Sequence, residues 1–145
     1  SINDGSAAVV MMRMSEAQKR GLQPLAKIHA HAGFSREPEW FTLAPIGAID
    51  RVMKKAGWSK ADVDLYEINE AFAVVAMAAI KDLGITHDVV NVNGGACALG
   101  HPIGASGARI VVTLIHALKQ RNLKKGIASL CIGGGEATAL AIEVL

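Results

Sequence analysis

Three polar side chains stand out because each is expected at the end of a strand or just beyond it. Asn69 follows the segment DLYEI, His101 lies in a glycine-rich loop, and Cys131 lies near the end of the apolar segment GIASLCI. An imidazole titrates near neutral pH and a free thiol can react as a thiolate, so these groups can carry chemistry. Ligands bind at the carboxyl edge of a parallel sheet. We therefore expect the three residues to converge at that edge, although they are far apart in the sequence.

Each of these residues also has a purely structural interpretation. Asn69 could cap the helix that follows it, because Asn is a favoured N-cap residue. A single histidine in a loop is more often a structural hydrogen-bonding residue, and a cysteine in an apolar strand is more often buried and inert. The residue pattern alone leaves both interpretations open.

The loop around His101 is unusually rich in glycine. The stretch NGGACALGHPIGASGARI, residues 93–110, contains five glycines and one His-Pro pair. Glycine at this density costs backbone entropy, so the pattern indicates a tight backbone path or the close approach of a ligand. A phosphate cradle before a helix is one alternative. However, Gly100, Gly104 and Gly107 lack the dinucleotide-binding spacing, and no Lys-Ser or Lys-Thr pair follows.

The apolar pattern predicts alternating strands and helices that would position these residues. The expected strands are residues 25–32, 64–68 and 89–92, followed by two strands on either side of Gly133-Gly134-Gly135-Glu136. The expected helices are residues 16–20 with Ser15 as the cap, 45–56, 71–83 and 104–120. This order predicts an α/β fold of the type βαβαβαββ. Its mixed five-stranded sheet has mainly parallel strands, the last antiparallel, and helices on both faces.

Composition excludes several classes of function. The chain has 145 residues and is 51% hydrophobic, which is enough for one globular core. A net charge of +2 and 4% aromatic residues argue against nucleic acid or an anionic membrane as a partner. The longest apolar run, residues 71–80, is too short to span a bilayer. Two cysteines do not make a disulfide framework, so we expect a reducing compartment.

Three segments together carry a resemblance to a known family. NEAFA, NVNGGACALGHPIGASGARI and LCIGGGEATALAIE resemble the C-terminal signatures of the thiolases, most closely those of the biosynthetic acetyl-CoA acetyltransferase branch. The opening INDGSAAVV resembles the segment that ends the N-terminal domain of that family. The resemblance implies that residues 1–14 are the last strand of an otherwise absent N-terminal domain. Residues 15–145 would then be the C-terminal thiolase domain, and the chain would be a fragment.

The resemblance also implies a reaction and the residues that perform it. Thiolases condense two acetyl-CoA molecules to acetoacetyl-CoA, or cleave that product with CoA, through an acylated cysteine. His101 would take the proton from the nucleophilic cysteine. Cys131 would be the second acid/base, and a neighbouring histidine could lower its pKa. His101 and a water fixed by Asn69 would hold the enolate oxygen, and the Gly133 N–H would serve a second oxyanion hole.

Further expectations concern substrates and partners. The resemblance implies that Ala71, Phe72 and Ile2 contact the pantetheine part of CoA. CoA thioesters would be substrates, and neither a cofactor nor a metal is expected. The nucleophilic cysteine of the family belongs to the N-terminal domain, and Cys97 is no substitute for it. The isolated chain would therefore be inactive, and the full-length enzyme would be a cytoplasmic homodimer or homotetramer, or mitochondrial or peroxisomal in a eukaryote.

Two alternatives remain at this point. The first is a degradative 3-ketoacyl-CoA thiolase, against which the Ile103 and Ser106 forms of the loop argue. The second is a non-catalytic thiolase-like binding module. Such a module would be expected to have lost His101 or Cys131, and both are present.

Overall fold

A computed structural model describes all 145 residues of the chain. The strands are β1 (Ala26–Ser35), β2 (Leu65–Ile68), β3 (Lys125–Ile132) and β4 (Glu136–Val144). The α-helices are α1 (Met14–Lys19), α2 (Ala44–Ala56), α3 (Ala73–Leu83), α4 (Ala96–Leu99) and α5 (Ser106–Gln120). Short 3₁₀ turns are η1 (Pro38–Leu43), η2 (Lys60–Asp62) and η3 (His87–Val89). No helix combines the length and the apolar character that crossing a membrane requires.

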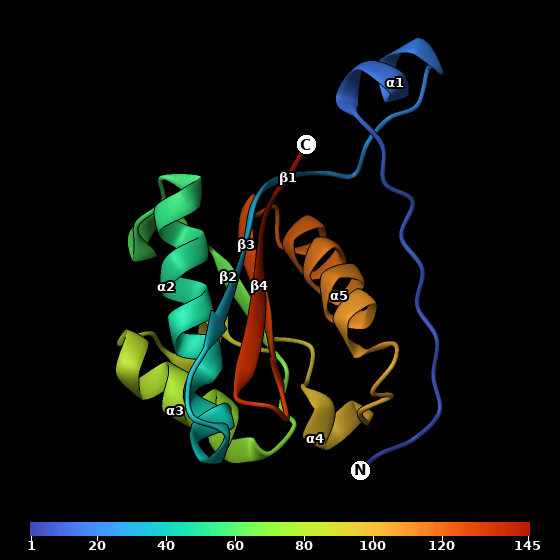
Figure 1. Ribbon diagram of the computed structural model, residues 1–145. Coiled ribbons are helices and arrows are strands. Elements are labelled where there is room, and N and C mark those ends of the chain that lie inside the picture. The colour runs from blue at the N-terminus through green and yellow to red at the C-terminus, as the bar shows by residue number, and fades with distance from the viewer.

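The strands form one mixed sheet in the order β1-β4-β3-β2 (Figure 1). β2 and β3 are parallel, whereas β4 pairs antiparallel with both β3 and β1. Three strands therefore run in one direction and β4 runs against them, as the sequence predicts. The turn between β3 and β4 makes the expected hairpin, with Gly135 N donating to Ile132 O at 3.2 Å.

The prediction of a fifth strand was wrong, because residues 89–92 do not form a ladder. Only an isolated parallel bridge joins Tyr66 to Val90. The turn η3 precedes this bridge, and Asn91 follows it with φ at 49°, in the left-handed region. The turn before Val90 and the left-handed residue after it leave only Val90 extended. The sheet therefore has four strands, and Val90 adds one isolated bridge.

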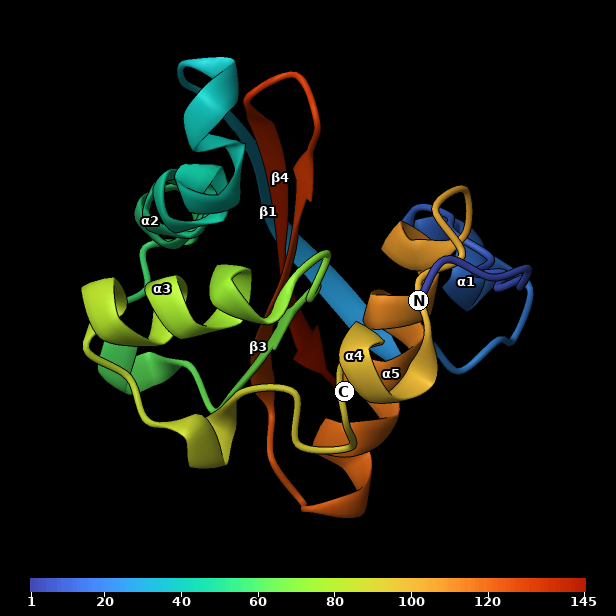
Figure 2. The ribbon, with the colours of Figure 1, turned by 90° about the horizontal axis from the view of Figure 1, so that it is seen from below.

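Helices cover both faces of the sheet, as predicted. Figure 2 shows α2 and α3 on one side and α5 on the other. The larger core lies under α2 and α3 and includes Ile49, Tyr66 and Ile127, and the smaller core lies under α5 and includes Leu114 and Ile142. Burial of these side chains is the main stabilisation of both layers.

The N-terminal residues differ from the expectation in two ways. No strand forms within residues 1–14, the segment expected to be a strand, and up to α1 only Ile2 makes a bridge. An isolated extended segment has no ladder partner for its backbone groups. Helix α1 begins at Met14 with Arg13 as its N-cap, so Ser15 is not the cap. The assignment of residues 1–14 to another domain stays a prediction.

Candidate active site

The carboxyl end of β2 brings Asn69 to His101. Asn69 is the first residue after β2, and its backbone N–H donates to Ser129 O at 2.9 Å, which continues the pairing with β3. His101 lies in the loop between α4 and α5. The Asn69 Nδ2 and His101 Nε2 atoms are 3.3 Å apart. The expected convergence of these two residues is therefore present.

Asn69 does not act as a helix cap. Helix α3 begins at Ala73, two residues later than predicted, and Phe72 is its N-cap without a side-chain hydrogen bond. The Asn69 side chain is 1% exposed and its amide faces the imidazole instead. The capping interpretation is wrong because the chain needs residues 70–72 to leave the sheet before it can turn into the helix.

Cys131 lies at the same edge of the sheet. The parallel register pairs Ile68 with Ser129, so Cys131 lies two residues further along β3, at the level just beyond β2. Burial raises the pKa of its thiol. The thiol makes no hydrogen bond to His101, and the expected lowering of its pKa by a histidine is absent. Cys131 is therefore a neutral thiol at rest.

Gly133 offers a free backbone donor in the hairpin turn. Its N–H donates to no acceptor of the chain, whereas the turn is closed by the N–H of Gly135. A Cβ added at Gly133 would meet no atom within 4 Å. A backbone N–H without an acceptor in the chain is what an oxyanion donor needs.

The three residues predicted to contact pantetheine lie around the site. Ala71 and Phe72 follow β2 closely in the chain, and Ile2 pairs with His101. Ile2 forms a parallel bridge with His101, and His101 N donates to Ser1 O at 3.0 Å. Ala71 is partly buried against the larger core. Phe72 is 60% exposed and its ring meets Phe41 edge-on, with ring centroids 6.4 Å apart. The contact of these residues with a ligand stays a prediction.

The structure explains part of the glycine pattern. Gly100 has φ at 96°, and a Cβ there would collide with the side chain of Asn3. A Cβ at Gly95 would collide with the carboxylate of Glu70. These glycines therefore permit a tight path of the chain itself. A Cβ at Gly104 or Gly107 would meet no atom within 4 Å, so no contact within the chain requires glycine at these two positions.

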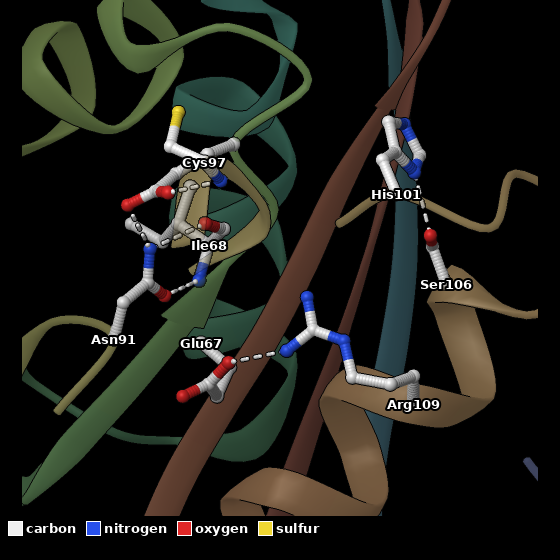
Figure 3. A network of polar contacts seen from close by, with 8 residues as sticks. Glu67, Ile68, Asn91, Cys97, His101, Ser106 and Arg109 are labelled. Carbon is white, nitrogen blue, oxygen red and sulfur yellow. Dashed lines mark hydrogen bonds and ion pairs between the residues drawn. The ribbon is translucent and has the colours of Figure 1, made fainter. Parts of the chain in front are cut away.

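Sequence reasoning missed the role of Asn91, whose side chain replaces part of the absent fifth strand. Its Oδ1 accepts from Ile68 N at 2.8 Å, and its Nδ2 donates to Ile68 O at 2.8 Å and to Glu70 Oε1 at 3.0 Å (Figure 3). Asn91 N also donates to Tyr66 O at 2.9 Å. The other oxygen of Glu70 accepts from Cys97 N at 3.0 Å. This clamp fixes the residues on both sides of Asn69.

A buried ion pair, also missed, lies next to the clamp. Glu67 of β2 is 1% exposed, and its Oε2 is 3.4 Å from Nη1 of Arg109 on α5 (Figure 3). Glu67 Oε1, the other two guanidinium nitrogens of Arg109 and Asn69 Oδ1 have no partner within the chain. Burial raises the pKa of Glu67 to about 7, the charge of Arg109 lowers it, and Glu70 raises it. A glutamate inside the apolar segment DLYEI was the available signal.

The environment of His101 favours the neutral imidazole. Burial lowers the pKa of His101, and the positive charge of Arg109 lowers it further. His101 Nδ1 lies 2.6 Å from Ser106 Oγ. The sequence had marked Ser106 only as a feature of one thiolase branch, and its contact with the imidazole was not foreseen. A neutral imidazole can accept a proton, which is what a general base must do.

Comparison with known proteins decides the family. The family model for "Thiolase, C-terminal domain" matches residues 22–144. The chain belongs to the thiolase family. An acetyl-CoA acetyltransferase of Chromobacterium violaceum is 54% identical over 142 residues, which cover 98% of this thiolase chain and 36% of the relative. The cytosolic acetyl-CoA acetyltransferase of Mus musculus is 51% identical over 142 residues, with the same shares of the two chains. The chain thus spans about a third of the curated relatives it matches.

Solved thiolase structures have the same fold. The acetyl-CoA acetyltransferase of Bacillus anthracis superposes with a TM-score of 0.90 at 50% identity, over 92% of this chain and 34% of that one. The Acat5 thiolase of Ascaris suum, solved in complex with coenzyme A, gives 0.86 at 46% identity, over 92% and 34%. Human mitochondrial 3-ketoacyl-CoA thiolase gives 0.88 at 41%, over 91% and 33%. The predicted thiolase fold is confirmed.

The clamp predicts that Asn91→Gly is strongly destabilising. Glycine keeps the left-handed backbone but leaves both buried polar groups of Ile68 without their partner. We expect a loss of roughly 3 kcal/mol in the free energy of unfolding, measured by denaturant titration. Asn122→Gly is the matched control, because exposed Asn122 also has positive φ, at 55°, and its side chain bonds to nothing. If both variants lost the same free energy of unfolding, the effect at Asn91 would come from the backbone and not from its side-chain hydrogen bonds.

The buried glutamate predicts a pH dependence of stability. The pKa of Glu67 is raised in the folded chain, so its contribution is fully present below about pH 4.5 and is lost as the pH rises through about 7. That loss is of the order of 3 kcal/mol. Glu67→Gln should flatten the unfolding free energy between pH 5 and pH 8, measured by denaturant titration. The exposed Glu39→Gln is the control, and an unchanged pH dependence in Glu67→Gln would contradict the assignment.

Proposed function

We infer that this chain is the acid–base domain of an acetyl-CoA C-acetyltransferase, a thiolase. The proposal rests above all on the contact between Asn69 and the neutral His101 at the edge of the sheet where Cys131 and the free Gly133 N–H also lie. Relatives at about half identity that are named acetyl-CoA acetyltransferase support this branch.

Each residue has a role in the proposed Claisen condensation. His101 Nε2 takes the proton of a nucleophilic cysteine, which displaces CoA from the first acetyl-CoA, and His101 passes that proton to the departing CoA thiolate. Cys131 then gives its own proton to His101 and, as thiolate, removes an α-proton from the second acetyl-CoA. The enolate carbon attacks the acyl-enzyme, and the cysteine thiolate that is released takes the proton back from His101. The imidazolium of His101 and a water held by Asn69 donate to the enolate oxygen, and Gly133 N–H donates to the thioester oxygen. Thiolysis is the reverse sequence.

The partners follow from the same proposal. The nucleophile would come from an N-terminal thiolase domain, since the chain spans about 36% of the relatives. CoA thioesters are the proposed substrates, and the Ascaris suum thiolase with bound coenzyme A supports this class. Ala71, Phe72 and Ile2 are the proposed pantetheine contacts. A homodimer or homotetramer and a cytoplasmic location, or an organelle in a eukaryote, complete the proposal.

The proposal is tested in a chimaera in which this chain replaces the matching segment of the Chromobacterium violaceum relative. The chimaera should cleave acetoacetyl-CoA with CoA. In it, Cys131→Ser should still be acetylated by acetyl-CoA, because His101 activates the nucleophile. The same variant should exchange the α-protons of acetyl-CoA with deuterated water about 10² to 10⁴ times more slowly. A folded, acetylated chimaera without thiolysis, or normal exchange in Cys131→Ser, would overturn the proposal.

Asn69→Asp tests the enolate site separately in the same chimaera. A carboxylate there would place negative charge beside the developing enolate and remove the amide donor. We expect the condensation rate to fall on the order of a hundredfold, with the thermal midpoint unchanged. Asn93→Asp is the control, because exposed Asn93 uses only its oxygen, which accepts from Arg121 at 3.0 Å. Wild-type condensation in Asn69→Asp would remove this residue from the mechanism.

A further inference from the structure

Ser106 is placed to control the polarity of the hydrogen bonds around His101. It is the first residue of α5 and is fully buried. Its Oγ lies 2.6 Å from His101 Nδ1 and donates to Pro102 O at 3.1 Å. The same carbonyl accepts the backbone N–H of Ala105 at 2.7 Å and that of Ser106 at 2.8 Å, which holds the serine in this position.

The hydroxyl has one proton. If its contact with Pro102 uses that proton, the oxygen can only accept toward His101, and Nδ1 must carry a hydrogen. A neutral imidazole has a single N–H, which leaves Nε2 with its lone pair. Asn69 Nδ2, a donor, faces that nitrogen at 3.3 Å. The contacts on the two sides of the ring thus agree on one tautomer.

We propose that Ser106 is a positioning residue that fixes His101 as its Nδ1–H tautomer, so that Nε2 is the proton-accepting atom. The reverse polarity would require two changes at once. The Ser106 hydroxyl would have to turn from Pro102 to Nδ1, and the amide of buried Asn69 would have to turn over. Neither contact of Ser106 needs to change when Nε2 gains a proton, because Nδ1–H is present in both charge states. The Nδ1 side of the ring is therefore already arranged for the charged imidazole before the proton arrives, whereas Asn69 Nδ2, a donor, must give up its contact with Nε2.

The tautomer is measured directly in the 15.2 kDa chain by nitrogen NMR of ¹⁵N-labelled histidine, with His101 assigned by its absence in His101→Asn. We expect a protonated Nδ1 and an unprotonated Nε2 in the wild type at neutral pH. Ser106→Ala should give a mixture of tautomers, and Ser106→Thr, which keeps a hydroxyl, should restore the single form. The matched control is Ser129→Ala, since the hydroxyl of buried Ser129 also donates to a backbone carbonyl, Thr138 O, and makes no hydrogen bond to a histidine.

The catalytic consequence rests on the proposed function and is measured in the chimaera. Loss of tautomer control in the Ser-His-Asp triad costs up to about 10⁴ in kcat. We expect Ser106→Ala to lower kcat tenfold or more with KM unchanged, Ser106→Thr to recover it, and Ser129→Ala to have no effect. An inactive chimaera with the expected tautomer would sink the proposed function alone. A wild-type Nε2–H tautomer, or an unchanged tautomer in Ser106→Ala, overturns the inference, and the wild-type spectrum decides even if Ser106→Ala does not fold.

Discussion

The site depends on how the short strand β2 is held on its two sides. β2 has only four residues, Leu65–Ile68, and all of them are buried. On one side the parallel ladder to β3 fixes its register. On the other side a single bridge at Val90 and the side chain of Asn91 take the place of a strand. Asn69 directly follows the strand that is held on both sides. Backbone contacts, rather than free rotation of the side chain, therefore set the direction of its amide.

The same edge of the sheet buries polar groups that do not contribute to an apolar core. Glu67 and Asn69 are each 1% exposed, and Arg109 is brought in from α5 to face the first of them. Burying an ion pair rarely stabilises a fold more than apolar residues of similar size would. The raised pKa of Glu67 reflects that cost. Polar groups kept at such a cost are typical of functional sites, and here they lie beside the residue that contacts His101.

The order of elements was predictable because apolar periodicity records which faces are buried. Helix α2 and its end at Gly57, and α3 with its end at Gly84, follow from that pattern and from the left-handed residue that each end needs. The absence of the fifth strand was not predictable, since nothing in the sequence around Asn91 shows that its amide pairs with the backbone of Ile68. The partners of Glu67 and of Asn69 lie 42 and 32 residues away. Local sequence therefore identified the reactive groups but not the contacts that orient them.

The ionisable groups around the site are either neutral or bonded to a partner within the chain. His101 and Cys131 are both neutral at rest, because burial and nearby positive charge lower the pKa of the imidazole and burial raises that of the thiol. The two carboxylates closest in sequence to Asn69 are engaged elsewhere. Glu70 accepts from Asn91 Nδ2 and Cys97 N, and Glu67 faces Arg109. An enolate that forms in the proposed reaction would thus meet donors whose positions are fixed in advance, while the neighbouring negative charges stay bound to their own partners.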